Sequence, residues 1–149
     1  MFEQNSGINA TGDVTLILKD SEGNVKDTRE IHNLVVTVGR EFIAARMAQT
    51  PGIMSHMAVG SGTVAPVAGN TSLGVQLGTR PALDEPAVVS GNVVTYKSTF
   101  VPGNGTGSVT EAGIFNASTA GTMLARTTFA VVNKTVDDSL TIIWNITIN

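Results

Sequence analysis

Cysteine is absent from the 149 residues, so the chain has neither a disulfide framework nor a thiolate metal site. Charged side chains make up 14% of the residues, against about 25% in a typical globular domain. The nine lysines and arginines are scattered and form no basic face, which predicts no nucleic-acid binding. No apolar run approaches the roughly 18 residues of a membrane span; the longest candidate, residues 34–48, is interrupted by Gly39, Arg40, Glu41 and Arg46.

Apolar residues are nevertheless common, at 42% of the chain, and the formal net charge is only -3. A small domain with an ordinary apolar content and so few charges has little to keep its surface in water. We therefore expect neighbouring chains to bury part of the surface, which predicts a homo-oligomer. The alternative is a monomer whose surface is solvated by its many Thr, Ser and Asn side chains.

The length predicts a single domain, residues 1–149, large enough to bury a core. Residues 1–12 are polar and indicate a mobile or docking arm. Residues 13–31 predict an N-terminal hairpin, because apolar and polar side chains alternate from Val14 to Leu18 and a turn sequence follows at 20–24. The returning strand, 25–31, is largely polar and is expected at a sheet edge, with His32-Asn33 interrupting it.

One helix is expected after residue 36, at the beginning of the β-rich core, residues 33–149. Thr37 is the predicted N-cap. Apolar residues then recur at helical spacing, and Thr50-Pro51-Gly52 ends the pattern. The predicted apolar stripe consists of Val38, Phe42, Ile43, Ala45 and Met47. Such an amphipathic helix of about three turns would pack on one face of a sheet.

The remaining pattern predicts short strands separated by turns. Residues 92–100 alternate cleanly, and Met57-Ala58-Val59 is a short apolar strand before a Gly/Ala/Pro/Thr loop. Asn70-Thr71-Ser72 is predicted to cap one short helical turn within this loop. Three further strands are expected at 110–116, 123–129 and 138–148. The fold class predicted is mainly β: an antiparallel β-sandwich or barrel-like sheet with one amphipathic helix.

No motif predicts a catalytic, cofactor or metal site. Gly60-Ser61-Gly62 follows a strand, but lacks the third glycine and the helix of a dinucleotide-binding turn, so a bulge or a tight strand exit is the better interpretation. His32 and His56 have no further ligands at close spacing. The acidic pairs Asp84-Glu85 and Asp137-Asp138 are adjacent residues, whose side chains point to opposite faces of a strand.

Glu111 and Arg126 are the two residues that stand out. Each is a single charge in a strand that is otherwise apolar and Thr-rich. If the two strands form a hairpin around residues 117–121, Glu111 and Arg126 lie near each other, although symmetry about residue 119 would place 112 opposite 126. A buried or interfacial ion pair is one hypothesis, and it would contribute to specificity more than to stability. The other is two solvated charges on an exposed face.

Four stretches of the chain resemble a family of small virion structural proteins of tailed bacteriophages, described as capsid decoration or tail-fibre-associated proteins. They are 33–39 (NLVVTVG), 57–63 (MAVGSGT), 110–116 (TEAGIFN) and 138–144 (DSLTIIW). Residues 1–30 need not belong to the shared core.

The resemblance implies a non-enzymatic β-rich building block, plausibly a trimer, that is added to a preformed capsid. Its expected partner is the major capsid protein, its expected location the virion surface, and its expected role stabilisation of the assembled head. The first alternative is a tail fibre or tail adaptor protein that contacts tail proteins and takes part in host attachment. The second is a glycan hydrolase, which would need a carboxylate pair formed by folding, with Glu111 or Asp84 as a member.

Overall fold

The computed structural model describes residues 7–149 and has a mainly β fold. Its only helix in that range is α1 (Thr37–Arg46). The strands are β1 (Ala10–Lys19), β2 (Val25–Val35), β3 (His56–Gly60), β4 (Gln76–Leu77), β5 (Val88–Ser90), β6 (Val93–Phe100), β7 (Gly107–Phe115), β8 (Met123–Lys134) and β9 (Ser139–Ile148). They form one antiparallel sheet in the order β4-β3-β7-β8-β2-β1-β9-β6-β5, and the sheet is not closed. The predicted fold class is confirmed.

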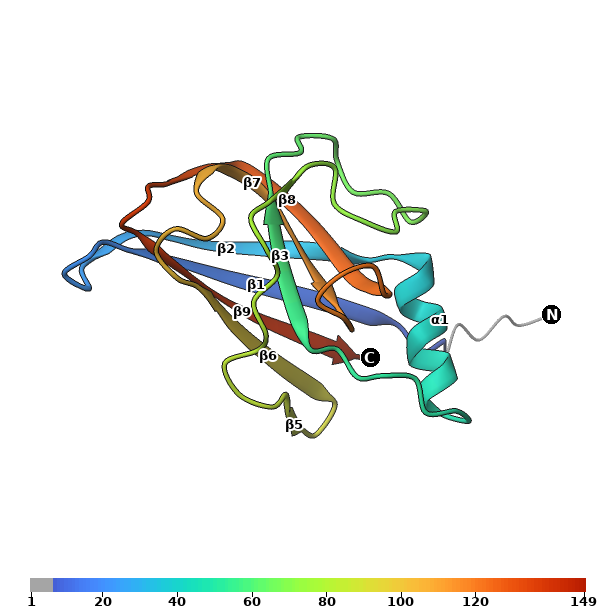
Figure 1. Cartoon of the computed structure of the whole chain (residues 1–149). Helices are drawn as coiled ribbons and strands as arrows, with labels where there is room; N and C mark the ends of the chain where they lie inside the picture. The colour runs from blue at the N-terminus through green and yellow to red at the C-terminus, as the bar shows by residue number, and fades with distance from the viewer. Residues whose placement is uncertain (1–6) are drawn as a thin grey trace.

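The sheet folds over on itself, so that its two halves face each other (Figure 1). The first half consists of β2, β1, β9, β6 and β5, and the second of β4, β3, β7 and β8. The halves are joined where the end of β2 pairs with β8, at Leu34–Arg126 and Val35–Ala125. Because each half buries one face, inward residues alternate with outward ones along the strands. The result is a sandwich-like core between the halves.

The core takes side chains from both halves. Trp144, Phe100, Leu16, Met57 and Ile114 are all at most 1% exposed, and they belong to one cluster. Trp144 comes from β9 and Leu16 from β1, whereas Met57 and Ile114 come from β3 and β7. Burying a large apolar side chain stabilises the fold by about 1.5–3 kcal/mol. Contacts between residues far apart in the sequence therefore hold the sheet together.

The N-terminal strands differ from the prediction. Of the expected arm, residues 1–6 lie outside the described residues, and Ala10–Gly12 already belong to β1. Residues 25–31 pair only with β1, as expected for an edge, whereas the end of β2, at Leu34 and Val35, also pairs with β8. β2 continues through His32-Asn33 to Val35. Pairing with β1 on one side supports this polar stretch, since Gly12–Asn33 and Asp13–His32 are register partners. The tertiary pairing outweighs the weak local preference of His and Asn for strands.

The helix also corrects two predictions. Val36, not Thr37, is the N-cap residue, and no side chain caps the helix. Val38, Phe42 and Ile43 pack against core clusters as expected. Met47, however, is 86% exposed, because the helix ends at Arg46.

The connection between β3 and β6 is mostly irregular. No helical turn follows Asn70-Thr71-Ser72; the short strand β4 is found at Gln76–Leu77 instead. β6 alternates as predicted, with Tyr96, Ser98 and Phe100 buried. β8 is longer than expected and runs to Lys134.

Candidate functional site

Glu111 and Arg126 form a buried ion pair between β7 and β8. Arg126 donates to Glu111 Oε2 from Nη2 at 2.8 Å and from Nε at 3.1 Å. The side chains are 0% and 3% exposed, respectively, so the alternative of two solvated charges does not hold. The strands pair Gly113 with Arg126 and Glu111 with Thr128, one residue away from the symmetric estimate. Glu111 and Arg126 are thus diagonal neighbours on the same face of the hairpin.

Backbone amides of the connection between β3 and β5 complete the environment of Glu111. Oε1 accepts hydrogen bonds from the N–H groups of Gly62 at 3.0 Å and Val75 at 2.8 Å. Oε2 accepts a third from the N–H of Gly74 at 2.9 Å. Together with the two bonds from Arg126, the carboxylate accepts five hydrogen bonds. An ionised carboxylate has about four lone-pair sites, so five donors saturate Glu111.

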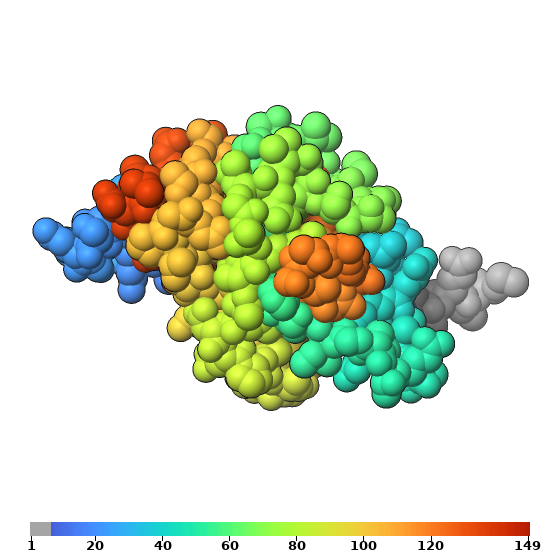
Figure 2. Space-filling view, viewed as in Figure 1, coloured from blue at the N-terminus to red at the C-terminus, as the bar shows by residue number. Residues whose placement is uncertain are grey.

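The guanidinium of Arg126 also makes hydrogen bonds to the connection between β3 and β4. Nη1 donates to Asn70 Oδ1 at 3.1 Å and Nη2 donates to the carbonyl oxygen of Val64 at 2.9 Å. Next to the pair, Thr110 Oγ1 donates to the carbonyl oxygen of Gly62 at 2.7 Å. The two strands therefore hold residues 62–75 in place through polar side chains. Figure 2 shows this part of the chain, in green, along the upper part of the visible face.

The glycines of Gly60-Ser61-Gly62 allow this close approach. A Cβ atom on Gly62 would lie 2.6 Å from Glu111 Oε1, and one on Gly60 would lie 2.2 Å from the carbonyl oxygen of Val75. The motif is a strand exit, as interpreted from the sequence, with β3 ending at Gly60. Its specific role, to admit a buried carboxylate, was missed. The spacing of glycines at 60, 62 and 74 was the available signal.

The hydrogen bonds also determine the charge of Glu111. Burial by itself raises the pKa of this carboxyl group, but the bonds from Val75, Gly74, Arg126 and Gly62 outweigh it, and the net pKa lies below the ordinary value. Glu111 is therefore ionised at neutral pH. A carboxylate that is ionised, fully buried and saturated with donors has no free oxygen lone pair for a substrate. The pair positions a loop and is not arranged for acid–base chemistry.

The other titratable residues singled out from the sequence are dispersed. His32 is exposed on β2 and contacts Asp13, while His56 Nδ1 lies 2.8 Å from Ser55 Oγ. Asp84 accepts a hydrogen bond from Thr99 Oγ1 at 2.7 Å. Within residues 7–149, no group of three or more His, Asp or Glu side chains is placed to hold a metal ion.

Asp138 forms the second buried polar contact. Its Oδ2 accepts hydrogen bonds from Lys26 Nζ and from the N–H of Thr135, both at 2.8 Å. The hydrogen bond from Lys26 is the main reason that the pKa of Asp138 lies below its ordinary value. This contact ties the turn between β8 and β9 to the N-terminal hairpin.

The outer face of the β1–β9–β6 region carries a strip of uncharged Thr and Ile side chains. Cross-strand register places Thr15 beside Ile143 and Ile17 beside Thr141, and Thr141 in turn beside Thr99. These side chains are half-buried by their neighbours in the strands. The helix does not cover them, since α1 contacts β8 at one end of the sandwich (Figure 1). We refer to Thr15, Ile17, Thr99, Thr141 and Ile143 as the Thr/Ile face. Charged groups border this face: Lys97 is the register partner of Ile143, Glu30 is that of Thr15, and Asp84 accepts a hydrogen bond from Thr99. Asp13 and Lys19 flank the face along β1.

No helix among the described residues is long and apolar enough to cross a membrane. Comparisons of the chain with protein-family models, with curated proteins and with solved structures found no match.

Proposed function

We propose that the chain is a bacteriophage virion structural protein, and specifically a capsid decoration protein that binds the assembled head. The observation that carries the proposal is the Thr/Ile face, a strip of five uncharged side chains on β1, β9 and β6 that α1 does not cover, with charged residues such as Glu30, Asp84 and Lys97 at its border. Protein interfaces commonly combine a centre that is depleted in charge with a polar rim, and this face has that composition. Its partner is the major capsid protein or a sister copy, consistent with a homo-oligomer such as a trimer.

The stretches that carry the family resemblance support the proposal in a different way. Three of them converge around the Glu111–Arg126 pair: β3 pairs with β7, and the end of β2 pairs with β8. These stretches build the interior of the second half-sheet. The fourth stretch, 138–144, belongs to β9 and contains Thr141 and Ile143 of the Thr/Ile face, the part that would meet a partner.

The mechanism is binding to the assembled shell in preference to its free subunits. A protein that binds only the assembled state stabilises it by mass action. Copies arranged around a symmetry axis strengthen each weak contact by avidity. A surface with few charges makes such contacts without the desolvation cost of buried ions.

The proposal is tested on purified particles of the bacteriophage that encodes this chain. Mass spectrometry of purified particles should detect the chain, and antibody fragments should label the whole head in electron micrographs. Labelling at a single vertex or along the tail would favour the tail adaptor instead. Absence of the chain from purified particles would refute both.

The Thr/Ile face is tested by substitution. Ile143→Glu should reduce binding to isolated heads by at least tenfold, because it places a charge in the centre of the face. Thermal unfolding verifies that the variant is folded, since Ile143 is half-buried. The matched control is Val136→Glu, which introduces the same charge at an exposed apolar residue in the turn between β8 and β9. Equal binding by the two variants would move the interface away from this face.

A further inference from the structure

An apolar pocket opens at the end of the sandwich where α1, β6 and β9 meet. Its volume is about 370 Å³. The floor is formed by core side chains, with Met54, Leu124 and Ile146 at most 2% exposed. The rim is apolar as well: Ile53 and Val89 line it and are 59% and 69% exposed. Small-molecule sites in proteins have volumes of about 300–1,000 Å³ and linings of this kind.

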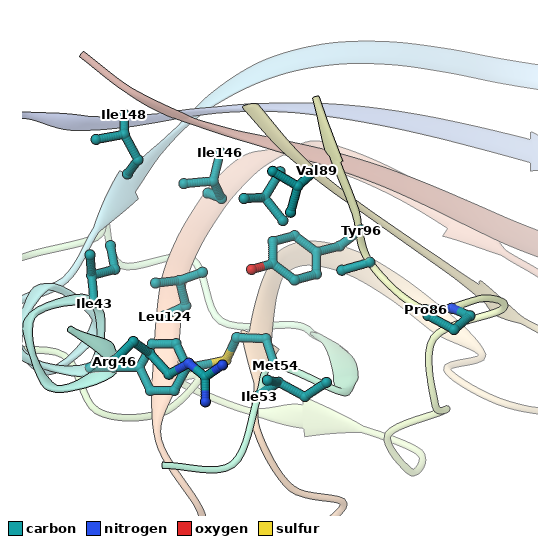
Figure 3. Close-up of a pocket in the computed structure, with 13 residues that line it drawn as sticks. Ile43, Arg46, Ile53, Met54, Pro86, Val89, Tyr96, Leu124, Ile146 and Ile148 are labelled. Atoms are coloured by element: carbon teal, nitrogen blue, oxygen red, sulfur yellow. The ribbon is translucent and has the colours of Figure 1, made fainter. Parts of the chain in front are cut away.

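Two polar groups face this apolar space. Arg46 provides the only charge in the lining, and Tyr96 provides a hydroxyl that points into the pocket, towards the side where Leu124 and Arg46 lie (Figure 3). Nη1 of Arg46 donates to the carbonyl oxygen of Pro51 at 2.9 Å, which holds the guanidinium at the mouth. Within residues 7–149, Arg46 has no carboxylate partner. Its remaining N–H groups are therefore available to an anion.

The Tyr96 hydroxyl is available as a donor too. No hydrogen bond within the described part of the chain uses it. Burial raises the pKa of Tyr96, and this outweighs the opposing effect of Arg46, so the phenol keeps its proton at neutral pH. A protonated phenol and a guanidinium at the edge of an apolar cavity are complementary to a carboxylate with an attached hydrocarbon chain.

We infer that the pocket binds an aliphatic carboxylate, with the chain lying over Leu124 and Ile146 and the carboxylate on Arg46 and Tyr96. The volume favours such a ligand over a single side chain of a docked protein. A cavity of about 150 Å³ already holds benzene, so one aromatic or aliphatic side chain would leave most of this pocket empty. The inference does not rest on the proposed virion function.

Calorimetric titration of the full chain with decanoate tests the inference. We expect saturable binding of one molecule per chain. Affinity should rise about fourfold for each methylene from octanoate to decanoate, as expected for burial of hydrocarbon, and level off once the pocket is filled. Decanol, which has the same chain without the charge, should bind about tenfold more weakly.

Variants separate the pocket from non-specific adsorption. Arg46→Gln should weaken decanoate binding about five- to tenfold and leave decanol unaffected, because only the charged contact is removed. Arg40→Gln, an exposed arginine of the same helix that does not line the pocket, is the matched control and should bind like the wild type. Tyr96→Phe should weaken binding by a smaller factor. Ala87→Trp should abolish it by filling the pocket, with circular dichroism to verify the fold.

Three results would overturn the inference: no saturable binding, equal affinities for decanoate and decanol, or equal effects of the Arg46 and Arg40 substitutions. Another occupant would also be recognisable. If the protein self-associates, Ala87→Trp dissociates it, and decanoate has no effect, the pocket is a contact between copies of this chain and the inference is wrong.

Discussion

Glu111 is the residue on which most of the polar interior depends. Its carboxylate, which is fully buried, accepts five hydrogen bonds from β8 and from residues 62–75. Removing one partner of a buried ion pair is more damaging than the net contribution of the pair suggests, because the remaining charge is left uncompensated. Loss of the Glu111 carboxylate would also free residues 62–75, whose backbone amides it binds.

Glu111→Gln should therefore lower the free energy of unfolding by about 3–5 kcal/mol. Glutamine keeps the shape but leaves Arg126 unpaired and turns an amide N–H₂ group towards backbone donors. Chemical denaturation measures the change. The control is Glu30→Gln on β2, an exposed residue, which should change stability by no more than about 0.5 kcal/mol. Similar values for the two variants would contradict the role given to the pair.

The lowered pKa of Glu111 predicts a dependence on pH with a definite sign. Because the folded state holds this carboxyl group ionised more strongly than the unfolded state, its stabilising effect is complete above the unfolded value of about 4.3. It is lost as the pH falls through the lower folded value. The difference in unfolding free energy between the wild type and Glu111→Gln should shrink steadily on acidification below about pH 5. A difference that stays constant or grows would be inconsistent with an ionised Glu111. The pKa of Asp138 is also lowered, so Asp138 contributes to the pH dependence of the unfolding free energy in both proteins.

At the level of elements, the position of α1 depends on Gly39. It is the buried residue of the helix, and a Cβ atom there would lie 2.0 Å from the carbonyl oxygen of Leu124 on β8. The neighbouring atom belongs to the backbone of a paired strand, so it cannot move aside as a flexible side chain would. The absence of a side chain is what allows the helix to pack directly on β8. The helix in turn supplies Phe42, Ile43 and Arg46 to the pocket.

Gly39→Ala should destabilise the protein by about 2 kcal/mol, because the overlap outweighs the gain in helix propensity of about 1 kcal/mol. Gly52→Ala is the matched control, since nothing lies within 4 Å of its Cβ position. That variant should be neutral or slightly stabilising. Thermal unfolding of both proteins gives the comparison. A stabilised Gly39→Ala variant would show that the helix can shift without loss.

At the level of the whole molecule, the last strand lies in the middle of the first half-sheet. β9 pairs with β1 along its full length on one side and with β6 on the other. Its inward side chains, Leu140, Ile142, Trp144 and Ile146, are at most 2% exposed. Each contributes about 1.5–3 kcal/mol, so together they match the total stability of a typical domain, about 5–15 kcal/mol. The first half-sheet has no continuous core without this strand.

A chain that ends at Asp138 should consequently fail to fold, and should show no cooperative unfolding transition by circular dichroism. Removal of Asn149 alone is the control. It deletes the terminal backbone pair with Asn9 and one exposed side-chain hydrogen bond to Thr11, and should lower the Tm by a few degrees. A cooperative transition in the shorter chain would mean that the second half-sheet folds independently.

Local patterns were sufficient to predict most strands. Alternation in Val93–Phe100 identified β6 and its buried side chains, and the turn signals separated β7, β8 and β9. The nearness of Glu111 and Arg126 also followed from the sequence, because a hairpin brings together residues that flank one turn. Local patterns did not predict the extent and pairing of a strand where these depend on a strand distant in the sequence. β2 continues through His32-Asn33 because β1 pairs with it, and its last residues, Leu34 and Val35, pair with β8 and join the two half-sheets.

The sequence by itself determined the class of fold, since apolar alternation and turn residues act over a few neighbouring positions. It also indicated a low-charge surface and one unusual pair of charges. The tertiary structure alone decided the order of the strands, the docking of residues 62–75 on Glu111 and the pocket beside Arg46. Each of these depends on contacts between residues tens of positions apart. Such contacts form only when burial of apolar surface and saturation of buried polar groups are satisfied together, and no local pattern records that balance.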